Sequence, residues 1–192
     1  MIAGRGLAKR YGERRVFAGI DFELPDGGFL LVTGPNGSGK STLLRVLAGL
    51  AAPTAGELEL PPRDAIGYLG HDPLVYRELT PLENLSLFGR LYRLPERGER
   101  IGMLLERFGL WEVRNDRVST FSRGMQQRLG LCRVLLHEPR LVLLDEPFNA
   151  LDAAGSELLE RTLEELRGRA LAVATHDPGR LDRFATQRLS FA

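Results

Sequence analysis

The sequence predicts an α/β fold in which helices cover both faces of a mainly parallel sheet. Three apolar segments, FLLVTG, LVLLDE and ALAVATH, are continuous rather than alternating, which is typical of strands buried on both faces. Helical patterns separate them, and the order strand, helix, strand is that of a parallel sheet. The first third of the chain instead has short, partly alternating strands between turns, which predicts an additional antiparallel β part.

The first half is expected to hold five strands and one short helix. The turn DGG leads into the first continuous apolar strand, and Leu43, Leu44 and Leu47 then follow at helical spacing up to Gly49. The expected strands are 3–11, 14–24, 29–34, 56–60 and 65–70, and the expected helix is 38–50.

The middle of the chain is expected to be helical, and the last third returns to strands. Thr80 is a plausible N-cap, with Pro81 at the first helical position and Glu83 three residues after the cap. The expected helices are 81–94, 101–110, 125–139 and 154–169, and the expected strands are 141–146, 170–176 and 186–191.

Length and composition indicate one globular domain, 1–192. The 26 basic and 25 acidic side chains nearly balance, which argues against a nucleic-acid partner. No apolar run approaches the 18 or so residues of a membrane span, and the first residues lack the apolar region of a secretory signal. We therefore expect a cytoplasmic protein, in which the single cysteine, Cys132, packs in the core.

The segment GPNGSGKS, residues 34–41, fits the phosphate-binding pattern GxxxxGK[ST] between a strand and a helix. Glycines let backbone N–H groups surround phosphate oxygens at a helix N-terminus. Lys40 is expected to reach the β- and γ-phosphates, and the Ser41 hydroxyl to bind magnesium. A glycine-rich turn without a ligand is the alternative. The expected nucleotide-binding residues here are Gly34, Pro35, Asn36, Gly37, Ser38, Gly39, Lys40, Ser41 and Thr42.

Two carboxylates follow the apolar strand LVLL. Asp145 would end the strand near the metal, because ligands of open α/β sheets lie beyond the carboxyl ends of the strands. Glu146 could then polarise the water that attacks the γ-phosphate. Acidic residues after a strand can also be a solvated turn or a helix cap. Together with the phosphate loop, they predict a P-loop (RecA-like) nucleoside triphosphatase.

The segment FSRGMQQR, residues 121–128, resembles the signature LSGGQQQR of the ATP-binding cassette (ABC) family. It departs from that pattern at Phe121, Arg123 and Met125. The resemblance implies ATP and Mg²⁺ as ligands and an ATP-dependent homodimer. In such a dimer Ser122 and Gly124 would contact the γ-phosphate held by the partner. It also implies an inserted helical signature subdomain at about 72–128, with the catalytic core and β subdomain at about 1–71 and 129–192.

Three further positions match the family. Asp152 in NALD resembles the residue of the family's D-loop at the dimer interface, and a helix N-cap is an equally plausible role. His176 matches the family's switch histidine, which contacts the γ-phosphate. Tyr11 resembles the aromatic side chain that stacks on adenine, with packing within a strand as the alternative.

His71 stands where most members of the family have a glutamine. The pattern YLGH.P......LT.LENL and the short length resemble the ATP-binding subunit of the haem exporter of cytochrome c maturation. His71 could act as a neutral donor or acceptor, as a metal ligand, or as a loop residue without a role.

The resemblance implies a peripheral ATPase on the cytoplasmic face of the membrane that drives a separate integral membrane permease, with haem as the expected cargo. The surface around residues 71–91 would contact that permease. The alternatives are the ATPase of another exporter, for drugs or lipids, a non-transport ABC ATPase that clamps DNA or ribosomes, and a small-molecule kinase with the same phosphate loop.

Overall fold

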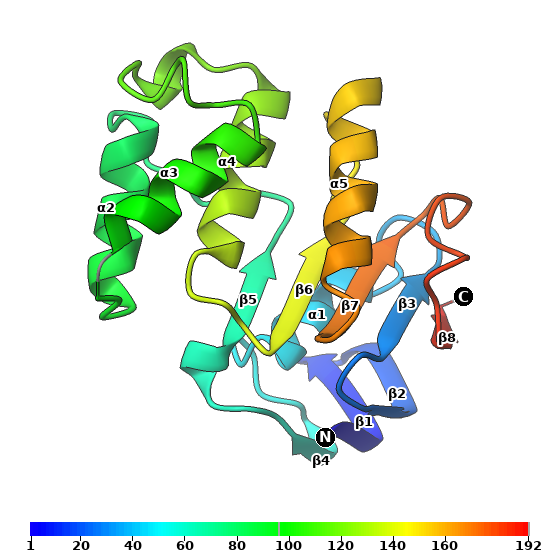
Figure 1. Ribbon diagram of the computed structural model, residues 1–192. Coiled ribbons are helices and arrows are strands. Elements are labelled where there is room, and N and C mark those ends of the chain that lie inside the picture. Colours follow the sequence, from blue (N-terminus) through cyan, green and yellow to red (C-terminus); the bar gives the residue numbers. More distant parts are fainter. Residues whose placement is uncertain (96, 192) are drawn as a thin grey trace.

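A five-stranded parallel sheet forms the centre of the molecule. The computed structural model describes residues 1–95 and 97–191. The strand order is β5-β6-β7-β3-β8, and every neighbouring pair is parallel (Figure 1). The fold class predicted from the continuous apolar segments is therefore confirmed. The strands are β3 (Phe29–Thr33), β5 (Ile66–Leu69), β6 (Leu141–Asp145), β7 (Ala170–Thr175) and β8 (Gln187–Ser190).

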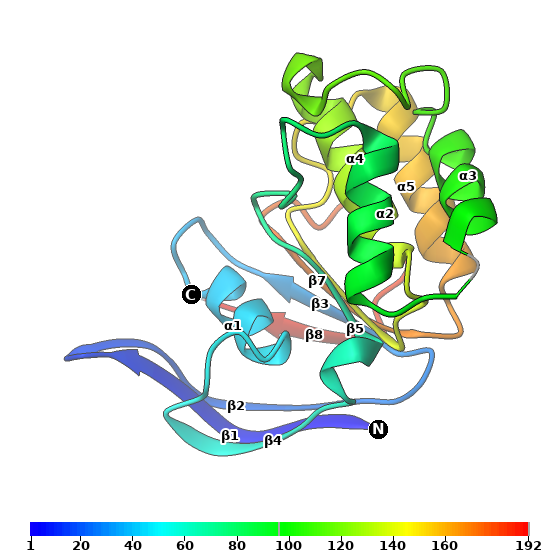
Figure 2. The same ribbon diagram turned by 90° about the vertical axis from the view of Figure 1, so that its left-hand side faces the viewer.

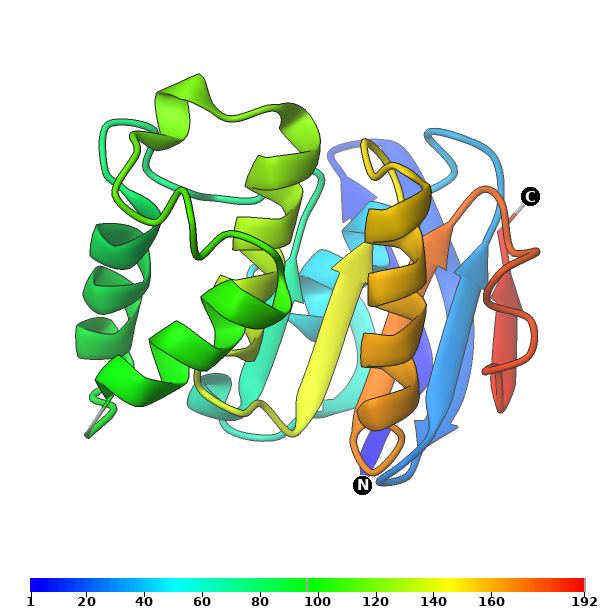
Figure 3. The ribbon, with the colours of Figure 1, turned by 45° about the horizontal axis from the view of Figure 1, so that its top comes forward.

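Helices cover both faces of this sheet, as Figure 3 shows with α5 in front of the strands and α1 behind them. The helices α4 (Arg123–Leu135) and α5 (Ala153–Glu165) pack on one face, and α1 (Lys40–Leu47) packs on the other. Phe29 and Leu31 of β3 lie in the apolar core under α4 and α5, whereas Leu30 and Val32 lie in the core under α1. Alternate residues of one strand are thus buried on opposite faces, which explains the continuous apolar sequence.

The first third of the chain forms the expected antiparallel sheet, with the order β2-β1-β4. Its strands are β1 (Ile2–Tyr11), β2 (Arg14–Leu24) and β4 (Ala55–Glu59). Figure 2 shows this sheet below α1, so that the helix lies between the two sheets. One apolar core joins β1, β2, α1 and the facing side of the parallel sheet.

A group of helices lies beside β5, the edge strand of the parallel sheet opposite β8 (Figure 1). It contains α2 (Pro81–Leu91), α3 (Arg97–Arg107), the 3₁₀ turn η2 (Val118–Thr120) and the start of α4. Another 3₁₀ turn, η1 (Arg63–Ala65), lies outside this group and leads into β5. The expected start of α2 is confirmed: Thr80 and Glu83 cap one another's backbone N–H groups, and Pro81 follows the cap. The helix α4 runs across residue 128, where the sequence placed the end of the helical subdomain.

Some predicted helix ends extend beyond the observed ones. The first helix begins at Lys40 rather than at residue 38, because Gly39 has a left-handed backbone with φ of 114°. The second ends at Leu91 rather than at residue 94, and Arg93 has φ of 56°, outside the right-handed helical region. Within the described ranges, no helix combines the length and the apolar character needed to cross a bilayer.

Candidate active site

A cavity of about 510 Å³ lies at the carboxyl ends of β3, β6 and β7. The phosphate loop follows β3, Glu146 follows β6 and His176 follows β7, so segments far apart in the sequence meet at one sheet edge. This is where open α/β sheets place their ligands. The lining residues are Tyr11, Arg14, Val16, Asn36, Gly37, Gly39, Lys40, Ser41, Thr42, His71, Asp145, Glu146, Asn149 and His176.

The loop 34–41 has the conformation that its glycines permit. Gly34, Gly37 and Gly39 have φ of 144°, 81° and 114°, which side chains of L-residues rarely tolerate. A Cβ atom on Gly34 would lie 2.6 Å from the carbonyl oxygen of Phe191, and one on Gly39 would lie 2.8 Å from Val16 Cγ1. Gly34 and Gly39 are therefore required both by backbone angle and by space, and Gly37 by backbone angle alone.

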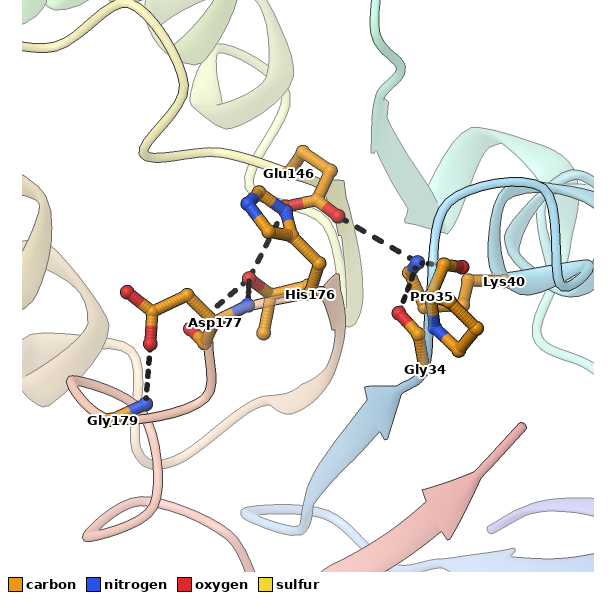
Figure 4. A network of polar contacts seen from close by, with 8 residues as sticks. Gly34, Pro35, Lys40, Glu146, His176, Asp177 and Gly179 are labelled. Carbon is orange, nitrogen blue, oxygen red and sulfur yellow. Dashed lines mark hydrogen bonds and ion pairs between the residues drawn. The ribbon is translucent and has the colours of Figure 1, made fainter. Parts of the chain in front are cut away.

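Lys40 is held inside this loop with 5% of its surface exposed. Its ammonium group donates to the carbonyl oxygens of Gly34, at 2.7 Å, and Pro35, at 2.9 Å (Figure 4). The Ser38 hydroxyl oxygen is buried in the same loop and has no hydrogen-bond partner. A buried cation and an unpaired buried hydroxyl both favour a polar, anionic ligand at this point.

Asp145 ends β6 with only 2% of its surface exposed. Burial raises the pKa of this carboxyl above its usual value, and the charge of Glu146 adds to that effect, while a hydrogen bond from Ser41 and the charges of His71 and Lys40 oppose it. The oxygen Oδ1 is buried without a partner. An ionised carboxylate here is costly unless a cation approaches it.

Glu146 lies between the phosphate loop and His176. Its φ of 49° is unusual for a residue with a side chain, and its N–H donates to the carbonyl oxygen of Ala174 at 2.8 Å. Nδ1 of His176 lies 2.9 Å from Oε2, and Nζ of Lys40 lies 3.8 Å from Oε1 (Figure 4). Because Oε1 is buried and has no hydrogen-bond partner, this is the oxygen that remains able to accept one.

The donors near Asp145 fit a magnesium ion. The unpaired Oδ1 of Asp145 and the neighbouring Ser41 hydroxyl are oxygen ligands, the type that Mg²⁺ prefers. The structure shows no cluster of three or more His, Cys, Asp or Glu ligands in the part of the chain it describes. Mg²⁺ in phosphate-binding sites is usually held by one or two protein ligands together with substrate phosphates and water, so the two oxygens of Asp145 and Ser41 are sufficient for the fit.

Tyr11 and His71 lie at two sides of the same cavity. Tyr11 ends β1 and is 52% exposed, and Nζ of Lys9 in the same strand lies 4.8 Å from its ring centroid, so the ring contacts a strand neighbour and also lines the cavity. His71 lines both this cavity and a second one of about 530 Å³, which also contains Glu146 and Asn149. The sequence pattern did not single out Arg14, Val16 and Asn149, which the fold adds to the lining.

The predicted signature residues do not line the 510 Å³ cavity. Ser122 caps α4 by accepting the N–H of Met125 at 3.2 Å, and Gly124 lies so near the next loop that a Cβ would be 2.8 Å from the carbonyl oxygen of Ala150. Asp152 caps α5 by accepting the N–H of Gly155 at 2.8 Å, which is the helix-cap role considered above. Within this chain these residues and the phosphate loop thus belong to separate sites.

The fold and the site together define a P-loop ATPase domain. The family model described as "ABC transporter" matches residues 17–149, more than half of the chain. This chain therefore belongs to the ABC transporter family of ATP-binding domains.

Three relatives illustrate the similarity. The chain is 39% identical over 184 residues to the uncharacterized ABC transporter ATP-binding protein YxlF of Bacillus subtilis, covering 92% of this chain and 62% of that protein. It is 38% identical over 188 residues to the cytochrome c biogenesis ATP-binding export protein CcmA of Cupriavidus necator, covering 92% and 83%. The dimeric structure of an ATP-binding cassette in a post-hydrolysis state, bound to ADP and Pi, matches with a TM-score of 0.88 at 28% identity, covering 100% of this chain and 94% of that chain. The chain thus spans less than two thirds of the length of YxlF.

Proposed function

We propose that this chain is the ATP-binding and ATP-hydrolysing subunit of an ABC transporter. The observation that carries the proposal is the meeting of Lys40 and Glu146 in one cavity at the end of the parallel sheet. The loop 34–41 and Thr42 bind the phosphates, and Tyr11 stacks on adenine. On binding, the Lys40 ammonium exchanges the carbonyl oxygens of Gly34 and Pro35 for β- and γ-phosphate oxygens.

Glu146 is the general base of the reaction we propose. Its Oε1 takes a proton from water while the water oxygen bonds to the γ-phosphorus. The bond from that phosphorus to the bridging oxygen breaks, which leaves ADP and inorganic phosphate. His176, 2.9 Å from the other carboxylate oxygen, orients Glu146 and contacts the γ-phosphate.

Asp145, Ser41 and His71 are the residues we propose around Mg²⁺. Asp145 supplies the unpaired buried oxygen and Ser41 supplies its hydroxyl. His71 lies at the wall shared by both cavities, where a ring nitrogen can accept from a water of the metal's shell. The ion offsets phosphate charge when bound.

We propose that two copies close head to tail around two nucleotides. Ser122 and Gly124 lie outside the cavity of their own chain, at a helix N-terminus that favours anions. Each would complete the other chain's phosphate site, with Asp152 at the interface. The similar solved structure is a dimer with ADP and Pi, which supports this arrangement.

Sedimentation tests the dimer. With Mg²⁺ and a non-hydrolysable ATP analogue the chain should shift from monomer to dimer, and with Mg²⁺ alone it should remain monomeric. A chain that stays monomeric with the analogue at every concentration, also in the presence of its membrane subunit, contradicts the proposal.

The partner we propose is an integral membrane permease, which places this chain on the cytoplasmic face of the membrane. Leu74, Tyr76 and Leu91 are exposed apolar side chains in the segment 71–91, where the family resemblance puts the coupling contact. Residues 72–93 include exposed Arg77, Arg90 and Arg93 and equally exposed Asp72, Glu78 and Glu83. These charges balance, so we expect the permease segment to dock mainly through apolar contacts. In this division of the chain, about 72–128 forms the helical subdomain, and about 1–71 and 129–192 form the core.

As the transported substance we propose haem, for cytochrome c biogenesis. The support is His71 with its flanking pattern, together with 38% identity to CcmA over nearly the whole chain. Transport of another substance is the second candidate, because the chain is equally similar to YxlF, an ABC transporter ATP-binding protein whose name states no cargo. Purification of the native complex tests the choice: haem absorbance that follows the permease supports haem export, and a haem-free complex that carries another ligand supports the second candidate.

A further inference from the structure

Thr175, the last residue of β7, lies directly behind the carboxylate of Glu146. Only 4% of its surface is exposed. Its hydroxyl oxygen is 3.2 Å from Oε2 of Glu146, 3.2 Å from the carbonyl oxygen of Asp177 and 3.1 Å from the backbone nitrogen of Asp177. The roles proposed above use the neighbouring His176 and leave this hydroxyl without a function.

One hydroxyl proton faces two acceptors. The N–H of Asp177 donates to the Thr175 oxygen, which leaves the single Thr175 proton for either the carboxylate or the Asp177 carbonyl. A hydrogen bond to an ionised carboxylate is about twice as strong as one between neutral groups. The proton is therefore donated to Glu146 while that side chain is ionised.

We infer that Thr175 is a positioning residue for Glu146, an inference that rests on the general-base role proposed above. Its hydroxyl and Nδ1 of His176 both bind Oε2, whereas Oε1 has no hydrogen-bond partner. Fixing one oxygen with two donors directs the other toward the phosphate loop, where Nζ of Lys40 lies 3.8 Å from it and its capacity to accept a hydrogen bond is unused. Figure 4 shows Glu146, His176 and Asp177 in one polar network, to which Thr175 belongs through these bonds.

The hydroxyl also links the base to the loop after β7. When Oε1 takes the proton of the attacking water, the carboxyl becomes neutral and its bond from Thr175 weakens. The Thr175 proton can then turn to the carbonyl of Asp177, which lies at the same distance of 3.2 Å. No atom is transferred from Thr175 in this step, because only its hydroxyl rotates.

The test is Thr175→Val, which keeps the shape of the side chain and removes the hydroxyl, beside Thr175→Ser, which keeps the hydroxyl. Loss of the positioning bond should lower kcat on the order of 10-fold, because a small displacement of a catalytic group is costly. KM and the Kd for the nucleotide should stay within about twofold, since the phosphate loop is unchanged. Thr175→Ser should restore most of kcat.

Thr162→Val is the matched control. Thr162 is also buried, with 1% of its surface exposed, and it does not line the phosphate cavity. Its hydroxyl donates to the carbonyl oxygen of Leu158 within α5 and accepts from Arg107 at 3.1 Å. Losing that hydroxyl should lower thermal stability and leave kcat unchanged. The inference is overturned if Thr175→Val retains kcat within twofold, if Thr175→Ser is as slow as Thr175→Val, or if Thr162→Val is equally slow.

Glu146→Gln, measured in the same series, separates this inference from the function on which it rests. Lost turnover in Glu146→Gln together with normal kcat in Thr175→Val rejects the positioning role alone. Retained turnover in Glu146→Gln rejects the general base itself, and with it both proposals.

Discussion

The phosphate cavity and the signature segment, residues 121–128, differ in how far one chain completes them. The cavity has its buried lysine, two carboxylates and two histidines in place, and one buried oxygen of each carboxylate lacks a partner. In the signature segment, the Ser122 oxygen is satisfied by the cap of α4, and the segment lines the adjoining 530 Å³ cavity through Arg123, Gln126 and Gln127 rather than the phosphate cavity itself. In the arrangement we propose, one chain therefore binds nucleotide alone, whereas the signature acts only when a second chain is present.

Glu146→Gln gives the largest effect expected. It keeps the shape of the side chain and removes the base, so kcat should fall about 10²- to 10⁴-fold, while nucleotide still binds and the dimer persists. Turnover and sedimentation in Mg²⁺ and ATP measure both. Glu160→Gln, at a carboxylate that pairs with Arg180 and Arg183, should keep normal turnover. Unchanged turnover in Glu146→Gln would contradict the assignment.

Lys40→Ala tests whether the cavity alone holds the phosphates. A hydrogen bond to a charged group contributes about 1.5–3 kcal/mol, so the Kd of the isolated chain for ATP should rise roughly 10- to 150-fold. Titration of the monomeric chain with a fluorescent nucleotide measures this Kd. Affinity equal to that of the wild-type chain would show that the loop 34–41 is not the phosphate site.

Ser122→Ala tests directly whether the signature segment acts only in the dimer. Monomer affinity for ATP should not change, because Ser122 lies outside the cavity. ATP-dependent dimerisation should weaken about 10-fold for each of the two charge-assisted hydrogen bonds that a dimer loses, or about 100-fold in all. Removal of the cap also costs about 1 kcal/mol of stability. Thr80→Ala removes the comparable cap of α2 and should leave the dimer unaffected. Weaker ATP binding by the Ser122→Ala monomer would break the distinction between the two sites.

Tyr11→Ala should have a smaller effect on nucleotide affinity. Stacking of a base on an aromatic ring contributes about 1–3 kcal/mol. Because the Tyr11 ring is 52% exposed, we expect a contribution of about 1 kcal/mol. The Kd for ATP should therefore rise about 5-fold, with Tyr11→Phe close to wild type. Equal Kd values for Tyr11→Ala and the wild-type chain would leave Tyr11 without a role in binding.

The sequence predicts those parts of the site that are local. The phosphate loop is contiguous, and its glycines specify its backbone, so the expected geometry follows from eight residues. Arg14 and Asn149 were missed because they reach the cavity from other segments of the chain. The contact of Thr175 with Glu146 was missed for the same reason: the two residues are 29 positions apart and meet because Asp145 pairs with Ala174 in the sheet.

Asp145→Asn should have a small effect on the free energy of unfolding, and it should be a gain rather than a loss. Because burial raises the pKa of Asp145 above that of the unfolded chain, the native state loses stability as the pH rises through the interval between the two pKa values. The neutral amide avoids this cost. Without nucleotide or metal, the variant should therefore be more stable near pH 7 by about 0.5–2 kcal/mol, as is common for substitutions that relieve a functional site.

The difference should shrink toward the acid end of that interval, because the wild-type carboxyl is then neutral as well. Thermal unfolding between about pH 4 and 8 measures it, with Asp26→Asn, at an exposed carboxylate, as the control expected to show no gain. Adding Mg²⁺ and ATP should reverse the order, since only the wild-type carboxylate binds the cation. A variant that is less stable than wild type without ligands would mean that Asp145 stabilises the fold. That result would contradict the view that the unpaired Oδ1 lowers the free energy of unfolding and is present because it binds magnesium.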